Sequence, residues 1–75
     1  MKTKNKFNNI DEVEKGMKVT YVTPHKIETG IVKSIADENH AFVVYNCNND
    51  WDNYENYTAA RTRLEDLRKG WDKDL

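Results

Sequence analysis

Residues 17–45 have the sequence MKVTYVTPHKIETGIVKSIADENHAFVVY, and this stretch decides the fold. Met17, Val19 and Tyr21 place apolar side chains at every second position. A two-residue period is typical of a β-strand that buries one of its faces. The sequence therefore predicts a first strand over Met17–Thr23.

Two further strands are predicted after the first one. Pro24 cannot donate a ladder hydrogen bond, so the first strand ends there. Ile27–Ala36 resumes the extended pattern around Gly30, and a glycine inside a strand is typical of a bulge or a sharp bend. The hairpin partner is predicted over Ala41–Cys47. This run is apolar on both faces, so we expect Phe7–Val13 to cover its outside.

The two ends of the chain show weaker patterns. Asn9 is placed to cap one or two helical turns, which a glycine in the left-handed conformation would end at Gly16. A fourth strand is predicted over Tyr57–Thr62, followed by a single closing turn over Leu64–Leu67. A helix over Ala59–Lys69 is the alternative, because its leucines would then form one stripe.

Size and composition bound the architecture. The chain has 75 residues, of which 33% are charged and 37% hydrophobic. A chain of this length buries only about 60% of the surface that its unfolded form exposes. We therefore expect one small domain over residues 9–75 and a flexible, basic, asparagine-rich arm over residues 1–8.

Charge and cysteine content narrow the functional classes. The net charge is −1, so the overall balance attracts neither a phosphate backbone nor an anionic membrane. A single cysteine, Cys47, excludes an internal disulfide and the multi-cysteine zinc patterns. With no apolar segment of signal-peptide or membrane-spanning type, the sequence predicts a cytoplasmic protein that is neither exported nor inserted.

The predicted strands resemble the SH3-like small barrels, including KOW and Tudor-type modules and many short proteins of bacteria and their phages. The resemblance covers residues 16–71 and rests on four short motifs: Gly16-Met17-Lys18-Val19, Gly30-Ile31-Val32, Phe42-Val43-Val44-Tyr45 and Glu65-Asp66-Leu67. It implies a mainly β fold, a five-stranded barrel with a 3₁₀ turn before the last strand. Arg68–Trp71 would then be that strand. Such a resemblance implies a fold far more than an activity.

An aromatic and acidic loop is the leading candidate for a binding site. Trp51 and Tyr54 are flanked by carboxylates between residues 46 and 56, and aromatic faces beside carboxylates suit a cationic or basic partner. The predicted binding set is Tyr21, Tyr45, Trp51, Tyr54, Tyr57, Asp50 and Asp52. The alternative is that Trp51 folds back as a lid on a small core. The main hypothesis is a non-enzymatic adaptor or inhibitor that binds a protein.

A KOW-like nucleic-acid module is the alternative function. Its basic face would consist of Lys18, Lys33, Arg61, Arg63 and Arg68. The acidic loop and the carboxylates near the C-terminus oppose it, and a solvated face of mixed charge is the simpler interpretation.

The sequence predicts no enzyme, no cofactor and no metal site. Cys47 with His25 or His40 lacks a diagnostic spacing, and a free cysteine that ends an apolar strand is typically a small buried hydrophobe. Near the C-terminus, Trp71 is expected to pack against Leu67 and Val19 across the barrel mouth. The alternative is an exposed apolar patch for a partner or a second copy of the chain.

Overall fold

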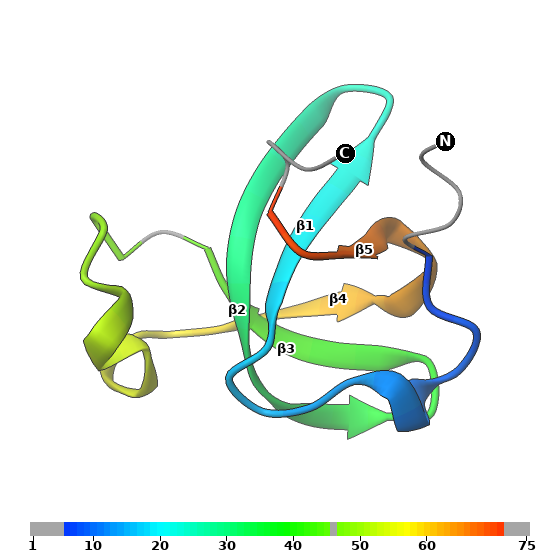
Figure 1. Cartoon of the computed structure of the whole chain (residues 1–75), viewed down its shortest axis with the longest axis horizontal. Helices are drawn as coiled ribbons and strands as arrows, with labels where there is room; N and C mark the ends of the chain where they lie inside the picture. Colours follow the sequence, from blue (N-terminus) through cyan, green and yellow to red (C-terminus); the bar gives the residue numbers. More distant parts are fainter. Residues whose placement is uncertain (1–5, 46, 72–75) are drawn as a thin grey trace.

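The computed structural model describes residues 6–45 and 47–71. Its antiparallel strands are β1 (Lys18–Thr23), β2 (Lys26–Asp37), β3 (His40–Val44), β4 (Ala60–Arg63) and β5 (Leu67–Lys69). Short 3₁₀ segments are η2 (Ile10–Glu12), η3 (Trp51–Asn56) and η4 (Leu64–Asp66). The strands form one sheet in the order β4-β3-β2-β1-β5 (Figure 1). The prediction of a mainly β fold with five strands is confirmed.

Strand β2 organises the sheet because it is long enough to pair on both sides. Its first half pairs with β1 and its second half with β3, and Ile31 is opposite Lys18 on one side and Val44 on the other. Gly30 lies at this crossing. A Cβ there would lie 2.6 Å from Val43 Cγ1 and 2.9 Å from the Val44 carbonyl oxygen, so only glycine fits. Gly30 thus allows strands β2 and β3 to approach each other closely.

The irregular pairing predicted near Gly30 lies further along β2. The register shifts occur between Val32 and Ser34 and again between Ile35 and Asp37. Extra residues at such shifts increase the local twist of a strand. The curl of β2 over β3 in Figure 1 is consistent with this.

The sheet is curled but open within the described residues. Strands β4 and β5 are its two outer strands, and no ladder joins them in residues 6–45 and 47–71. The outer side of β5 receives a single bridge from Lys6 to Arg68, whereas β4 pairs with β3 alone. The five strands are therefore established without closure into a barrel.

The main core lies on the concave side of the sheet, where it gathers Phe7, Val13, Val19, Val32, Ala41, Val43 and Leu67. The prediction that Phe7–Val13 covers the outside of β3 is therefore wrong. Its two apolar ends pack on the concave side with Ala41 and Val43, because the strands alone leave that core unfilled.

A second buried group lies on the opposite face of the sheet. Ile31 and Val44 are paired neighbours on this face, and each is less than a tenth exposed. Cys47, which is 1% exposed, adds a third buried apolar side chain just after β3. Segment η3 packs against β2, so the predicted loop supplies cover for the sheet.

Strands β3 and β4 are shorter than predicted. Strand β3 ends at Val44, so Cys47 lies outside it, and β4 begins at Ala60 and not at Tyr57. Both ends have one cause. The ladder of β3 with β2 stops at the Ile31–Val44 pair and its ladder with β4 stops at the Val43–Ala60 pair, so among the described residues the chain after Val44 has no ladder partner.

The last strand is also shifted, from the implied Arg68–Trp71 to Leu67–Lys69. Gly70 ends it with a φ of 82°, and the Gly70 carbonyl accepts a hydrogen bond of 2.6 Å from Thr20 Oγ1. Trp71 was expected beside Leu67 and Val19, and this is wrong. Its indole nitrogen donates to the Gly30 carbonyl at 3.0 Å, because the turn at Gly70 sends the chain over β2.

The N-terminal turn is capped as predicted but is shorter, because η2 ends at Glu12 with Val13 as its C-cap, before Gly16. The Asn9 side chain caps η2 by accepting from the Asp11 backbone N–H at 2.9 Å, and Gly16 has a φ of 87°. The alternative helix over Ala59–Lys69 is wrong, because this segment forms β4, η4 and β5. In the part of the chain that the structure describes, no helix has the length and apolar character needed to cross a membrane.

Candidate functional site

The predicted aromatic loop is tied down by its own polar side chains. Asp50 accepts hydrogen bonds from the Tyr57 hydroxyl and from Asn53 Nδ2, both at 2.8 Å. The bond to the Asp50 carboxylate raises the pKa of Tyr57, because it stabilises the protonated phenol. Glu55 pairs with Lys15 at 2.7 Å. Two of the loop's carboxylates therefore hold η3 in place.

The ring of Trp51 packs against the ring of Trp71. Their ring centroids are 5.3 Å apart with an interplanar angle of 49°. Lys18 Nζ lies 4.6 Å from the centre of the Trp71 ring, within the range of a cation–π contact. Trp51 is half-buried, and its partner Trp71 is itself bonded to the Gly30 carbonyl of β2, which favours the lid interpretation over an open loop.

Tyr21 and Tyr45 form a different aromatic pair on the concave side. Their ring centroids are 5.8 Å apart in an edge-to-face arrangement. The Tyr45 hydroxyl lies 2.9 Å from Thr62 Oγ1. Burial raises the pKa of Tyr45 to about 12, because the phenolate would lose its hydration. Both rings remain only partly covered.

A groove of about 500 Å³ runs beside this tyrosine pair, and we call it the tyrosine groove. One side is the end of the β1–β2 hairpin and the other is strand β4. It is lined by Tyr21, Lys26, Glu28, Tyr45, Ala60, Arg61, Thr62, Arg63 and Asp66. The groove joins two half-buried aromatic rings to charges of both signs.

The predicted binding set is thus divided between two places. Tyr21 and Tyr45 lie in the tyrosine groove, whereas Asp50, Trp51 and Tyr57 hold the η3 segment. The remaining two members also belong to that segment. Tyr54 is half-buried, with its hydroxyl near Gly16, and Asp52 is exposed.

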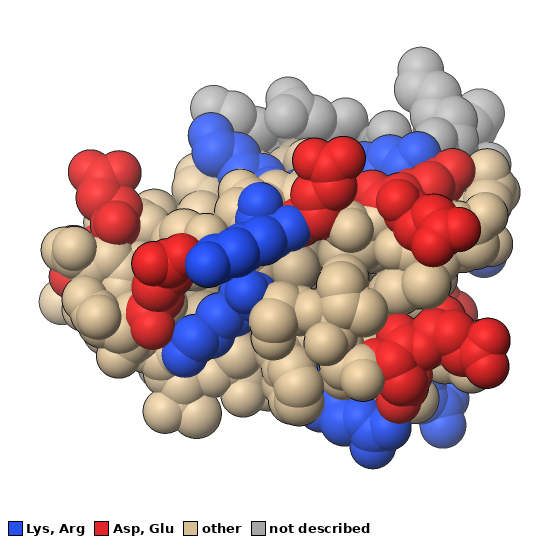
Figure 2. Space-filling model, turned by 90° about the horizontal axis from the view of Figure 1, so that it is seen from below, with Lys and Arg blue, Asp and Glu red and all other residues tan. Residues whose placement is uncertain are grey.

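The five residues of the alternative basic face are spread over four strands. Lys33 Nζ donates to the Tyr57 carbonyl at 2.7 Å, and Arg68 donates to the Glu65 carbonyl at 2.9 Å. Arg61 and Arg63 pair with Asp37 and Glu65. Figure 2 shows lysine and arginine side chains next to acidic ones on one face of the molecule.

Asp37 is the most heavily engaged carboxylate of the tight β2–β3 turn. It accepts from the Asn39 N–H and lies 2.8 Å from His40 Nδ1, while Arg61 reaches it at 2.6 Å. The bonds from His40 and Arg61 hold the pKa of Asp37 well below its ordinary value. This cluster joins the turn to Arg61 of β4, which lines the tyrosine groove.

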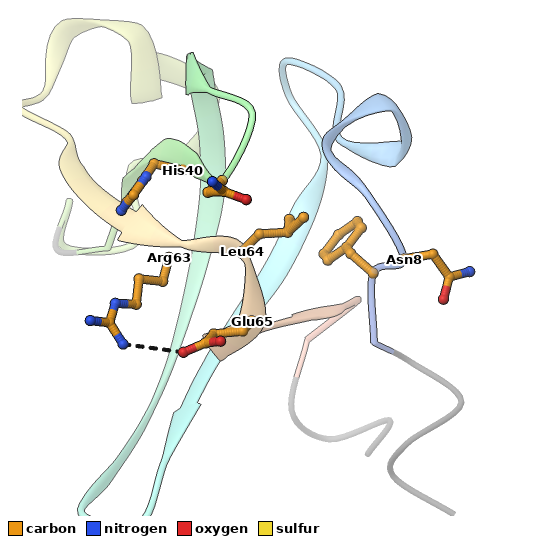
Figure 3. A pocket seen from close by; sticks show the side chains of 7 residues that line it. Asn8, His40, Arg63, Leu64 and Glu65 are labelled. Atoms are coloured by element: carbon orange, nitrogen blue, oxygen red, sulfur yellow. Dashed lines mark hydrogen bonds and ion pairs between the residues drawn. The ribbon is translucent and has the colours of Figure 1, made fainter.

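A second cavity, of about 370 Å³, lies where the N-terminal segment meets η4. In Figure 3 the Leu64 side chain points into this space, while the paired Arg63 and Glu65 lie at its rim. Phe7, Asn8, Asn39 and His40 complete the lining. It contains one phenyl ring, that of Phe7, whereas the tyrosine groove contains the paired rings of Tyr21 and Tyr45.

Several groove residues had no functional signal in the sequence. Lys26 and Glu28 face each other as an ion pair of 3.4 Å on β2, and Thr62 is buried on β4. Thr62 is the buried residue of β4, whose other three residues are exposed, and the local sequence does not indicate this difference. The position of β4 across from the β1–β2 hairpin depends on the whole sheet, so sequence spacing does not reveal it.

Among the residues described, no three His, Cys, Asp or Glu side chains gather as a metal ion requires. Comparisons with protein-family models, curated proteins and solved structures found no match.

Proposed function

We propose that this chain is a non-enzymatic, SH3-like module that binds another protein, acting as an adaptor or an inhibitor. Support for the SH3-like class comes from the strand order and from the 3₁₀ turn η4 between β4 and β5. In this proposal the tyrosine groove is the binding surface, with the η3 segment as its structural support.

One observation carries this proposal. Tyr21 and Tyr45 keep part of their rings open along a groove whose rim is charged. Together with tryptophan, tyrosine and arginine are the residues most enriched among those that dominate binding energy at protein interfaces, in pockets with a polar rim. The predicted loop has less to offer, because its Trp51 and two carboxylates are engaged internally.

The proposal is tested by selecting binders from a random peptide display library with the intact protein. Tyr21→Ala and Trp51→Ala are matched truncations of half-buried aromatics, one inside the groove and one outside it. Tyr21→Ala should weaken the selected peptides by at least about fivefold, since loss of an interface anchor costs more than about 1 kcal/mol. Trp51→Ala should leave their affinity nearly unchanged.

The opposite pattern would place binding at η3, and a library without any binder would contradict the protein-binding proposal itself. The nucleic-acid alternative has its own measurement, which is fluorescence anisotropy with mixed oligonucleotides at low salt. We expect no binding, because the basic residues are spread apart and neighboured by carboxylates. Binding that falls steeply with added salt would favour that alternative.

A further inference from the structure

Strand β4 borders the tyrosine groove along its whole length. All four of its residues, Ala60 to Arg63, line the groove. Successive side chains of a strand point to opposite faces, so four consecutive residues border one groove only where the groove follows the backbone edge. The tyrosine groove therefore exposes the edge of β4 as well as its side chains.

The ladder pattern identifies the polar groups on this edge. Leu64 N–H donates to the Asn39 carbonyl at 2.8 Å, and antiparallel ladders alternate residue by residue. Ala60 and Thr62 thus direct their backbone groups to β3, and Arg61 and Arg63 direct theirs to the groove. The Arg63 carbonyl caps η4. Three groups remain at the edge: the N–H and C=O of Arg61 and the N–H of Arg63.

Resting on the proposed protein-binding function, we infer that β4 recruits its partner by strand addition, taking up an extended segment that alternates acidic and apolar side chains. An added strand satisfies the three edge groups, and main-chain bonds of this kind supply affinity while alternate side chains supply specificity. Of the two outer strands, β5 already carries the bridge from Lys6, so β4 is the edge available within the described residues.

The outer face of β4 selects acidic side chains. Arg61 and Arg63 are exposed there, and each uses one terminal nitrogen in its ion pair, Arg61 with Asp37 and Arg63 with Glu65. A guanidinium carries five N–H donors, so further donors remain for a carboxylate on the next strand. Opposite charges directly across two strands are stabilising.

The inner face selects neutral, apolar side chains. The tyrosine rings supply apolar surface on this side, at the position that the partner's alternate residues would face. On this face, the carboxylates of Glu28 and Asp66 outnumber the amine of Lys26. Their negative charge disfavours a further acidic side chain here. The two faces together specify the alternation.

A second copy of the chain fits this edge poorly. Antiparallel pairing of two β4 strands about a two-fold axis would set arginine against arginine on the outer face. Like charges directly opposite each other destabilise a strand pair, and charged edge residues commonly prevent such association. The arginines therefore favour an acidic partner strand over self-pairing.

The test uses synthetic hexapeptides with the intact protein. One probe alternates glutamate and valine, and its control alternates lysine and valine. We expect the glutamate peptide to bind at least tenfold more tightly. On binding, amide hydrogen exchange of Arg61 and Arg63 should slow at least tenfold, whereas exchange of the Thr62 amide, which bonds to β3, should change much less.

Backbone involvement is tested from both sides of the interface. N-methylation of alternate peptide nitrogens gives two probes, one methylated on the nitrogens that face the β4 edge and one on the nitrogens that face away from it. Only the first probe should lose at least tenfold in affinity. On the protein, Arg61→Pro removes an N–H that faces away from β3 and is compatible with an edge strand. Its matched control, Arg61→Ala, keeps this N–H and should bind at least fivefold more tightly than Arg61→Pro.

Three results would overturn strand addition while leaving the protein-binding function intact. In the first, library-selected peptides bind but the glutamate peptide does not. In the second, the two N-methylated probes bind with equal affinity. In the third, amide exchange at Arg61 and Arg63 is unchanged in the complex. Concentration-dependent protection of the same amides in the free protein would assign the edge to a second copy and also overturn it. Absence of any peptide binder contradicts the proposed function instead.

Discussion

At the residue scale, a few side chains and one glycine decide the geometry of the groove. Gly30 lets β2 pass close to β3, and this brings Tyr45 beside Tyr21. Asp37 joins the β2–β3 turn to Arg61 of β4. At each of these positions, a single substitution removes the space or the contact on which the geometry of the groove depends.

Gly30→Ala should destabilise the protein by about 1–3 kcal/mol, the usual cost of forcing an extra carbon into a packed site. The added Cβ would meet the Val44 carbonyl at 2.9 Å, and backbone cannot move aside as a flexible side chain can. Urea unfolding measures the change. Ser34→Ala, an exposed position on the same strand, is the control and should change stability by less than about 0.5 kcal/mol. Equal stability of the two variants would contradict the close approach.

Asp37→Asn should reduce stability at neutral pH and weaken its dependence on acid. The pKa of Asp37 is lower in the folded state than its ordinary value of 3.8, so its ionised form stabilises the fold above that pH. This contribution is lost as the pH falls below the ordinary value towards the folded one. Urea midpoints of both proteins should differ most above about pH 5 and approach each other as the pH falls below the ordinary pKa of 3.8 towards the folded one. A difference independent of pH would contradict the assignment.

At the element scale, η3 is a structural cover for the outer face of the sheet. Asn48 and Asn49 adopt positive φ values of 55° and 67° before it, a conformation that asparagine tolerates well. Asp50 then receives two side-chain hydrogen bonds, and Lys33 reaches back to the Tyr57 carbonyl. The segment is held at both ends, which suits a lid more than an open binding loop.

Asp50→Asn should lower the pKa of Tyr57 towards that of an ordinary tyrosine. The carboxylate raises this pKa through its hydrogen bond and its charge, and the amide keeps the shape without the charge. Ring-carbon NMR across an alkaline titration follows each tyrosine separately. Tyr45, whose pKa of about 12 is due chiefly to burial, should not respond and serves as the internal control. An unchanged Tyr57 would contradict the contact with Asp50.

At the scale of the whole molecule, the small core is completed by segments far apart in the sequence. Phe7 and Val13 reach it from the N-terminal segment and Leu67 from β5. The sheet wraps this core and stays open at β4. The same curvature that buries the core leaves the groove and the strand edge exposed.

Leu67→Ala should cost about 2–5 kcal/mol, because the side chain is 0% exposed and its removal leaves a cavity. Leu64→Ala is the matched control at a half-buried position of η4 and should cost distinctly less. Thermal unfolding compares the two variants. Similar losses would mean that β5 contributes no more to the core than η4 does.

Local pattern predicts much of the secondary structure. Alternation over Met17–Thr23 and the apolar run after Asn39 predict strands, because a period of two residues directly specifies the face that is buried. Strand ends were less predictable. Val44 ends β3 because the ladders of β3 with β2 and with β4 stop at Val44 and Val43, and no residue near Val44 indicates this.

The candidate site was predicted in part. Tyr21 and Tyr45 were in the predicted set and lie together, yet the loop residues grouped with them hold η3 instead. Aromatic residues have the same composition signal whether they form a lid or a binding surface. Only the packing of Trp51 against Trp71 distinguishes the two.

The sequence by itself determined the strand periodicity, the positions of the turns and the mixture of charges, because these depend on neighbouring residues. The tertiary structure decided which aromatics meet, which face each apolar segment covers and which strand edge stays open. These depend on contacts between residues distant in the chain, where register and curvature act together. The groove beside β4 therefore exists only in the folded protein.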